Sequence, residues 1–446
     1  MKLVRGISEA MEALSRGRSL DLLDVPPHVQ ATTQRVFGEP LTPPETVRRI
    51  IDMVRSDGDQ AIRRLAKDLE SASLDALEVS RAEIQDCYDR VDARVIEALE
   101  LSAERVESYH RATKRQTWMD FEEGYGAIVT PLASVGAYVP GGSAPLPSTV
   151  IMSAVPARVA GVPELLLCTP PDASGSPSPV TMVAASIAGV DRVFRIGGAQ
   201  AIAAMAYGTE TVPRVDMVCG PGNVFVTLAK KMVYGDVGID GLYGPTETLI
   251  IADETANPTL CAADLLAQAE HDPLAKPVLV TTSERLARSV DKELEARLSR
   301  LERKAIASRS VSDNGCIAVV DSLDEALELS NWFAPEHMCL MVEHPWALVA
   351  GVRNAGALFI GEFSHEVLGD YVAGPSHVMP TGGTARFSSG LGVHSFVKIT
   401  PVLALSPEAS LSLGQSASTI ARAEGLTAHA EAAEVRQEIF SKTSGA

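Results

Sequence analysis

Two stretches of the chain decide its fold class: residues 193–200 read V-F-R-I-G-G-A-Q, and residues 215–223 read V-D-M-V-C-G-P-G-N. In each of them a short apolar run opens onto a glycine turn, and a helical pattern follows. A third apolar run, residues 164–168, ends at Thr169-Pro170-Pro171. Because strands that alternate with helices at this spacing form parallel βαβ units, we predict an α/β protein with parallel sheets. Such sheets bind ligands at the carboxyl ends of their strands, where these glycine turns lie.

A second α/β stretch spans roughly residues 249–393. Its expected strands lie at residues 278–282, 316–320 and 357–360. The region before these two stretches reads as mostly helical, with one helix that Thr42 caps and Pro43 begins. After Ser406 the chain is again helical to its end, with a break around Gly425.

The chain has 446 residues, with 39 Lys and Arg against 57 Asp and Glu, and a formal net charge of −18. This length exceeds one ordinary core, so we expect two or more domains. The negative charge argues against nucleic acid or an anionic membrane as the main partner, because both reward clustered Lys and Arg. The sequence shows neither a signal-peptide pattern nor an apolar run near the roughly 20 residues of a membrane span.

The six cysteines are scattered along the chain, and no C-x-x-C pair occurs. Sparse cysteines are typical of the reducing cytoplasm, where we expect this protein, and they offer no thiolate zinc site. A bound metal must therefore find nitrogen and oxygen ligands. The sequence also contains no G-x-G-x-x-G, so that fingerprint gives no support for dinucleotide binding.

The strongest local pattern is residues 257–271, N-P-T-L-C-A-A-D-L-L-A-Q-A-E-H. Asn257 caps the expected helix and Pro258 takes its first position. Gln268 and His271 are three residues apart, so they share one face near the helix end, where the partial negative charge favours a cation. An amide oxygen and an imidazole nitrogen are a plausible half of a zinc site. The commoner interpretation is that His271 only interacts with the last carbonyls of the helix.

Three further clusters hold titratable side chains. Glu336 and His337 are adjacent and offer two bases for successive proton transfers, although exposed pairs of this kind are far commoner. A Gly- and Pro-rich loop and the tail supply the other candidates: Glu366, Asp370, Tyr371 and His377 in the loop, and Glu424 and His429 in the tail. Each cluster by itself is more often structural than catalytic. Together they offer the His, Asp and Gln ligands that a zinc site without cysteine needs.

Eight longer motifs follow one another along the chain: V-G-A-Y-V-P-G-G-S-A-P (135–145), I-G-G-A-Q-A-I-A (196–203), V-C-G-P-G-N-V-F-V-T (218–227), Y-G-P-T-E-T-L-I-I-A-D (243–253), A-A-D-L-L-A-Q-A-E-H (262–271), A-P-E-H (334–337), G-D-Y-V-A-G-P-S-H-V-M-P-T (369–381) and G-L-T-A-H (425–429). In this order they resemble the histidinol dehydrogenase family over nearly the whole chain. That family binds NAD without the G-x-G-x-x-G fingerprint.

The resemblance assigns roles to the candidate residues. Four positions match the family's zinc ligands: Gln268, His271, Asp370 and His429. Glu336 and His337 match its catalytic acid/base pair. Three positions match its NAD contacts: Tyr138, Gln200 and Asn223. The positions that touch substrate in the family are matched by the four zinc ligands, by His337, and by Thr246, His377 and Glu424. Glu366 is a weaker candidate for such a contact.

The resemblance also implies a fold and an assembly. The fold is two incomplete Rossmann-like domains with parallel sheets, plus helical terminal segments, in a homodimer that exchanges its tails. The implied boundaries are 1–30 for an N-terminal segment, 31–130 with 245–385 for the domain that carries the metal and catalytic residues, 131–244 for the NAD-binding domain, and 386–446 for a helical tail that completes the partner's site.

The implied reaction is the oxidation of L-histidinol to L-histidine through L-histidinal, with one zinc per subunit and two NAD. It implies a small amino alcohol as substrate. The sequence departs from the usual family pattern at Tyr243, at Ser376 and at Trp332. These departures leave one alternative open, which is a paralogous zinc and NAD enzyme that oxidises another hydroxyl compound, for example one of sulfopropanediol type.

Overall fold

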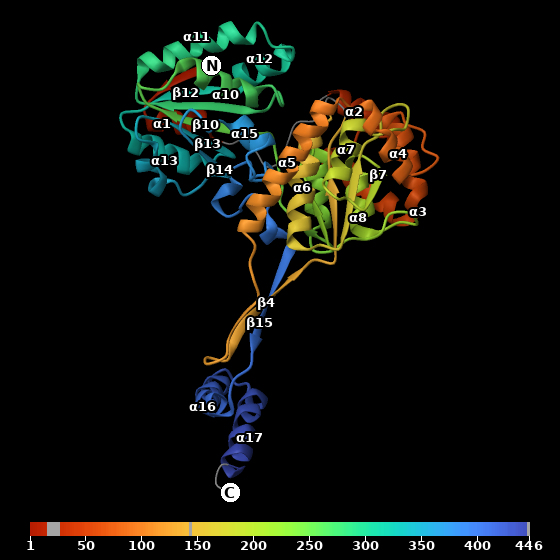
Figure 1. The fold of residues 1–446 in the computed structure, drawn as a ribbon, viewed down its shortest axis with the longest axis vertical. Helices are drawn as coiled ribbons and strands as arrows, with labels where there is room; N and C mark the ends of the chain where they lie inside the picture. Colours follow the sequence, from red (N-terminus) through yellow and green to blue (C-terminus); the bar gives the residue numbers. More distant parts are fainter. Residues whose placement is uncertain (16–26, 142–144, 444–446) are drawn as a thin grey trace. The chain divides into compact units, whose positions relative to one another are not determined.

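The computed structural model describes residues 1–15, 27–141 and 145–443. The chain divides into two compact units, and each is described by itself (Figure 1). The first unit comprises Met1–Lys114 and Leu132–Phe396, and the second comprises Arg115–Pro131 and Val397–Ala446. None of the helices that the structure describes is long and apolar enough to cross a membrane.

One six-stranded sheet of the first unit has the strand order β2-β7-β6-β5-β8-β9. Its strands are β2 (Glu78–Val79), β5 (Ser134–Tyr138), β6 (Glu164–Thr169), β7 (Arg192–Arg195), β8 (Met217–Cys219) and β9 (Gly238–Ile239). All neighbours are parallel except β2, which runs antiparallel to β7. The central order β7-β6-β5-β8 is that of a Rossmann half, with the reversal of strand order between β5 and β8. The three apolar runs at residues 164–168, 193–196 and 215–219 are confirmed as strands, shifted by one or two residues.

The other six-stranded sheet is wholly parallel, with the order β1-β12-β11-β10-β13-β14. Its strands are β1 (Lys2–Arg5), β10 (Glu247–Ala252), β11 (Lys276–Thr281), β12 (Cys316–Val319), β13 (His337–Met341) and β14 (Ala357–Ile360). Counted from β10, the order is again that of a Rossmann half, with the reversal between β10 and β13. The prediction of an α/β fold with two Rossmann-like sheets is therefore confirmed.

Helices cover both faces of each sheet. In β10, Leu249 and Ile251 pack toward α1 and α13, while Ile250 and Ala252 pack toward α10 and α11. All six residues of β10 are buried, as expected for a strand between two helical layers. The helices are α1 (Ile7–Ala13), α2 (Pro27–Phe37), α3 (Pro43–Glu70), α4 (Arg81–Asp86), α5 (Ala93–Ala112), α6 (Pro147–Ala160), α7 (Pro179–Ile187), α8 (Gly198–Tyr207), α9 (Val224–Val233), α10 (Pro258–Ala269), α11 (Glu284–Leu298), α12 (Lys304–Asp313), α13 (Leu323–Phe333), α14 (Pro345–Leu348) and α15 (Glu366–Tyr371).

The structure contradicts the predicted grouping of residues 31–130 with residues 245–385, and helix α3 gives the reason. Thr42 caps it in a capping box and Pro43 begins it, as predicted. However, α3 belongs with the first sheet and not with residues 245–385, because its buried face packs in one core with α8 and α9. The strand β2 that follows pairs with β7 of the same sheet. The periodicity of α3 identified its apolar face but could not identify the distant sheet that this face covers.

The predicted N-terminal segment 1–30 is also not separate from the second sheet. Its strand β1 pairs with β12 and extends the second sheet, and α1 packs on the same core as α13. Residues 16–26 of this segment lie outside the described residues, as do Gly142, Ser143 and Ala144 of the 135–145 motif.

The second unit joins a three-stranded antiparallel sheet to a helical pair. The sheet has the order β15-β4-β3, from Val397–Leu403, Tyr125–Pro131 and Trp118–Asp120. The helices are α16 (Pro407–Ala423) and α17 (Thr427–Thr443), and Arg422 of the former pairs with Glu434 of the latter at 2.6 Å. The helical tail after Ser406 and its break at Gly425 are confirmed. The prediction of a helical segment from residue 386 is wrong, because β15 begins the tail and pairs along its length with β4.

Candidate active site

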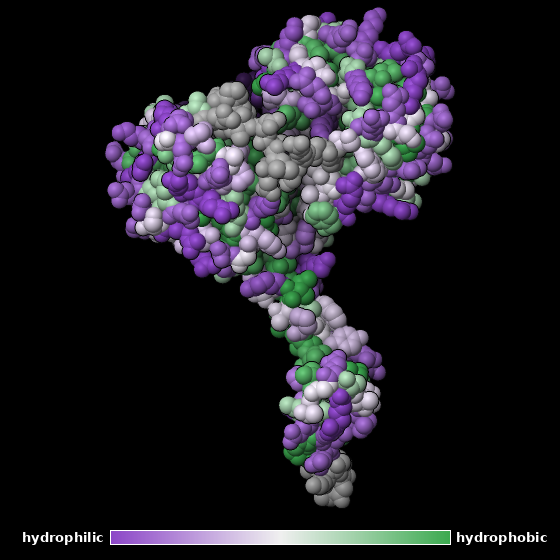
Figure 2. All heavy atoms as spheres, turned by 180° about the vertical axis from the view of Figure 1, so that it is seen from behind, coloured by the Kyte–Doolittle hydropathy of each residue, from purple (hydrophilic) through white to green (hydrophobic). Residues whose placement is uncertain are grey.

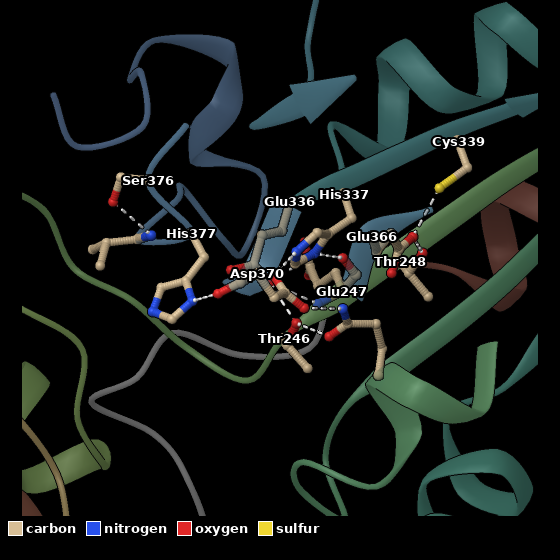
Figure 3. Close-up of polar contacts among 12 residues, drawn as sticks. Thr246, Glu247, Thr248, Glu336, His337, Cys339, Glu366, Asp370, Ser376 and His377 are labelled. Atoms are coloured by element: carbon tan, nitrogen blue, oxygen red, sulfur yellow. Dashed lines mark hydrogen bonds and ion pairs between the residues drawn. The ribbon is translucent and has the colours of Figure 1, made fainter. Parts of the chain in front are cut away.

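A cavity of about 230 Å³ in the first unit gathers most of the candidate residues (Figure 3). They are Thr246, Gln268, His271, Glu336, His337, Asp370, Tyr371 and His377. In the second sheet the cavity lies at the amino ends of β10 and β13, because Thr246 directly precedes β10 and His337 begins β13. This edge is opposite to the carboxyl edge at which parallel sheets usually bind their ligands. The first sheet does contribute from its carboxyl edge, through Thr149 after β5 and Pro221 after β8.

Glu336 and His337 are both buried, with exposed fractions of 7% and 3%. The commoner interpretation of a solvent-exposed pair therefore does not hold. A left-handed turn at Ala334 (φ 53°) ends α13 and leads into β13. Thr246 Oγ1 donates to Glu336 Oε2 at 2.6 Å, and the Glu247 amide donates to the same oxygen at 3.1 Å. Burial nevertheless raises the pKa of Glu336 to about 7. A carboxyl group with such a pKa can accept or release a proton near neutral pH.

The ring of His337 is held on both sides. Its Nδ1 lies 3.2 Å from the Glu247 carbonyl oxygen, and its Nε2 lies 3.2 Å from Asp370 Oδ1. The ring stacks on Phe359 with the centroids 5.9 Å apart. Burial disfavours the protonated ring, but the carboxylates of Glu336 and Asp370 outweigh it and raise the pKa of His337 to about 10. Any ligand that engages the Asp370 carboxylate would therefore lower the pKa of His337.

Three of the four expected zinc ligands line this cavity. Gln268 Nε2 donates to Asp370 Oδ2 at 3.2 Å, and Gln268 Oε1 lies 3.0 Å from Thr246 Oγ1. Asn257 caps α10 as predicted, but α10 ends at Ala269, so His271 lies just beyond the helix rather than in its last turn. An amide oxygen, an imidazole nitrogen and a carboxylate oxygen are hard and borderline donors that suit Zn²⁺.

These three ligands include only two ionisable ones, His271 and Asp370. Consistent with this, no group of three or more His, Cys, Asp or Glu side chains in the described part of the chain is placed to hold a metal ion. The fourth expected ligand, His429, lies with Glu424 in the second unit, and both residues are exposed. The cavity is lined by residues of the first unit alone.

His377 and Glu366 lie on different sides of Asp370 (Figure 3). His377 lines the cavity, with Nδ1 2.7 Å from the Asp370 carbonyl oxygen and Nε2 3.2 Å from Thr149 Oγ1. Glu366 is fully buried and is not among the lining residues. It accepts hydrogen bonds from Thr248 and Cys339, behind the cavity. The geometry therefore supports His377 as a substrate contact and places Glu366 away from the cavity.

The three positions that depart from the family pattern differ in how they lie relative to the cavity. The buried ring of Tyr243 lies against the Lys230 ammonium, with Nζ 4.6 Å from the ring centroid. Ser376 Oγ donates to the Met152 carbonyl at 2.9 Å and so points away from the cavity. Trp332 packs against the core on the α13 side of the second sheet. Of the three, only Tyr243 lines the cavity.

A second cavity, of about 420 Å³, lies at the carboxyl ends of β5, β6, β7 and β8, as predicted for the first sheet. All three expected NAD contacts line it. Tyr138 Oη accepts from the Gly198 amide at 3.1 Å. Asn223 Oδ1 accepts from the Phe225 and Val226 amides and caps α9, which leaves its Nδ2 for a ligand. The N-termini of α8 and α9 both lie at this edge of the sheet. Helix dipoles and backbone amides at such ends favour the binding of phosphate groups.

Two lining residues were missed by the sequence analysis. Thr149 reaches His377 from the first turn of α6, and Glu70 reaches Gln200 from the last turn of α3. Each contact joins residues more than a hundred positions apart, so no local signal in the sequence could have identified it.

Two parallel Rossmann-like sheets, a buried Glu–His pair in one cavity and a second cavity at the carboxyl ends of the first sheet are together typical of a dehydrogenase. The histidinol dehydrogenase family model matches residues 41–437. A histidinol dehydrogenase of Dehalococcoides mccartyi is 48% identical over 98% of this chain and 100% of its own length. One from Deinococcus radiodurans is also 48% identical, over the same shares of both chains.

A crystal structure of histidinol dehydrogenase from Elizabethkingia anophelis matches the fold with a TM-score of 0.90, at 34% identity and 99% coverage of both chains. The chain therefore belongs to the histidinol dehydrogenase family of NAD-dependent oxidoreductases. The alternative of a paralogue for another hydroxyl compound receives no support from these relatives.

Proposed function

We propose that this chain oxidises L-histidinol to L-histidine through L-histidinal, in two hydride transfers to two NAD, as the last steps of histidine biosynthesis. The observation that carries the proposal is the buried pair of Glu336 and His337 beside the donor set of Gln268, His271 and Asp370. A cationic amino alcohol is compatible with the negative net charge of the chain. The six free cysteines, all buried, suit the cytoplasm as the place of action.

Gln268, His271 and Asp370 would hold zinc, with His429 as the fourth ligand. The metal would supply the positive charge that positions the amino and imidazole nitrogens of the substrate. The remaining steps belong to the side chains around it. With its carboxylate engaged in this way, Asp370 would raise the pKa of His337 less, which favours the neutral ring that accepts a proton.

In the first oxidation, His337 Nε2 takes the proton of the alcohol while hydride leaves the carbinol carbon for NAD. In the second, Glu336 takes a proton from the water that hydrates the aldehyde. Thr246 and the Glu247 amide hold the Glu336 carboxylate in place, and its pKa of about 7 suits a base near neutral pH. Tyr138, Gln200 and Asn223 would contact the NAD that accepts each hydride.

The active form would be a homodimer in which the second unit of each chain brings Glu424 and His429 to the partner's cavity. Large apolar side chains on this unit support an interface, because a small unit rarely leaves so many of them in solvent. Figure 2 shows such apolar patches on its surface. The exposed apolar side chains of this unit include Trp118 (53% exposed), Phe121 (87%), Leu413 (56%), Ile420 (60%), Ile439 (57%) and Phe440 (47%).

The direct test is turnover of the purified protein with histidinol and NAD. The proposal expects two NADH for each histidinol consumed, with histidine as the product. A sulfopropanediol-type alcohol, tested in parallel, should give far lower turnover. One NADH per substrate, or preference for the other alcohol, would contradict the proposed reaction.

A further inference from the structure

The Glu70 carboxyl group occupies an unusual position in the larger cavity. Glu70 is the last residue of α3, and its Oε1 accepts from Gln200 Nε2 at 3.2 Å. Its Oε2 is buried and has no hydrogen-bond partner among the described residues, and the same is true of Gln200 Oε1. A buried carboxylate oxygen without a partner is costly, so its persistence points to a ligand that satisfies it.

The absence of a side chain at Gly197 leaves room for the Glu70 carboxylate. A Cβ atom on Gly197 would lie 2.1 Å from Glu70 Oε1 and 2.7 Å from Pro170 Cβ. Gly197 follows β7 and Pro170 follows β6, so the carboxylate lies at the carboxyl ends of these two strands. In a Rossmann half, this side of the sheet holds the adenosine of a dinucleotide.

A Rossmann domain usually binds the ribose hydroxyls of NAD with an acidic residue at the end of its second strand. Here the second strand is β6, which ends at Thr169. The next acid along the chain, Asp172, accepts from Ser174 and Ser176 in its own turn and is not among the residues that line the cavity. Glu70 brings a carboxylate to the same edge from a helix that is distant in the sequence. Apolar side chains on the walls of the cavity can pack on an adenine ring; they are Phe37, Ile50, Leu69, Pro171 and Phe225.

We propose that Glu70 binds the hydroxyls of the adenosine ribose and thereby selects NAD over NADP. This inference rests on the proposed binding of NAD in the larger cavity. A carboxylate accepts hydrogen bonds from the 2′-hydroxyl but repels a 2′-phosphate. No Arg or Lys is among the described residues that line the cavity, so these residues provide no cation to compensate a 2′-phosphate.

The test is equilibrium binding measured by calorimetry without substrate, which does not depend on turnover. The ligands are NAD, NADP and an NAD that lacks the 2′-hydroxyl of its adenosine ribose. The proteins are the wild type, Glu70→Gln, and Asp68→Asn as a matched control on the same turn of α3. Because burial raises the pKa of Glu70 to about 7, the measurements are made at pH 8.5, where its carboxyl is ionised.

The wild type should prefer NAD, and Glu70→Gln should weaken NAD binding by about 10- to 100-fold, the range for a hydrogen bond to a charged group. NADP should lose little in the same variant, so the preference for NAD should fall at least about tenfold. Removal of the 2′-hydroxyl should weaken binding to the wild type and to Asp68→Asn, but hardly to Glu70→Gln.

An unchanged preference for NAD in Glu70→Gln would overturn the assignment. So would equal binding of NAD and its 2′-deoxy form to the wild type, a comparison that needs no variant and stands even if Glu70→Gln fails to fold. The proposed NAD site is tested separately by Gln200→Ala and Asn223→Ala. If the wild type binds NAD and these variants weaken it, only the role of Glu70 is rejected. If the wild type binds no NAD, the proposed function itself fails.

Discussion

Glu336 and His337 are neighbours in the chain, but different surroundings control their protons. Glu336 is a carboxyl whose charge is disfavoured by burial, while His337 is a ring between two carboxylates. Environments that move the pKa values of two adjacent groups in this way are typical of residues with separate acid/base roles.

Replacing either residue should lower turnover by about 10²- to 10⁴-fold, the usual contribution of a positioned general base. His337→Asn should slow the oxidation of histidinol more, and Glu336→Gln should slow the oxidation of histidinal more. Because Glu336 must be ionised to act as a base, the rate of aldehyde oxidation should fall as the pH drops through about 7. Rates of both half-reactions against pH provide the measurement. Equal, mild losses in both half-reactions would contradict these roles, as would an unchanged acid limb in Glu336→Gln.

Zinc content should depend on single ligand side chains. The wild type should hold about one zinc per subunit, and His271→Ala or Asp370→Ala should lose most of it, since three remaining ligands bind much more weakly. Neither residue belongs to a core cluster of the described residues, so both variants should stay folded by circular dichroism. Metal analysis after dialysis makes the comparison, with the exposed His344→Ala as control. Full zinc occupancy in both ligand variants would reject the assignment.

At the scale of elements, one loop joins the two cavities. The turn after β8 contributes Pro221 to the smaller cavity and Asn223 to the larger one. A buried ion pair holds this turn. Lys230 Nζ of α9 lies 2.5 Å from Asp240 Oδ1 and donates to the Gly220 carbonyl at 2.9 Å. The Gly220 amide in turn donates to Asp240 Oδ2 at 2.7 Å.

Breaking this pair from one side should be strongly destabilising, because it leaves the other charge buried and alone. Lys230→Met should lower the free energy of unfolding by about 3–5 kcal/mol. The double variant Lys230→Met with Asp240→Asn should recover part of this loss, because it contains no unpaired charge. Denaturant unfolding of the two single variants and the double variant completes the cycle. Strictly additive losses would show that the two charges are not coupled.

At the scale of the whole molecule, the proposed active site needs two chains. His429 and Glu424 are exposed in a unit that is separate from the other ligands. In a two-fold dimer both tails would cross in the same way, so each site would combine the first unit of one chain with the second unit of its partner.

Mixing two inactive variants tests this arrangement. His429→Ala and Asp370→Ala should each be nearly inactive as homodimers. In a hybrid dimer, one site carries both defects and the other is intact. Random reassembly makes half of the dimers hybrids, so about a quarter of wild-type activity should return by symmetry. The control is each variant dissociated and reassembled alone. Hybrids identified by two tags but without activity would show that the tail serves its own chain.

The elements whose signals are local could be predicted from the amino-acid sequence. The apolar runs predicted β6, β7 and β8 to within two residues, and Thr42 and Asn257 marked the starts of α3 and α10. These signals work because capping and burial depend on residues a few positions apart. The family resemblance assigned roles to the candidate residues, and seven of its catalytic, zinc and substrate positions share one cavity with Tyr371.

Tertiary structure alone decided which distant surfaces meet. It determined that α3 covers the first sheet, that Glu336 and His337 are buried at the amino ends of their sheet, and that Glu70 lies against Gly197. These outcomes depend on contacts between residues far apart in the chain. A helical or strand pattern specifies which face is apolar, but the partner of that face is chosen by packing over the whole fold.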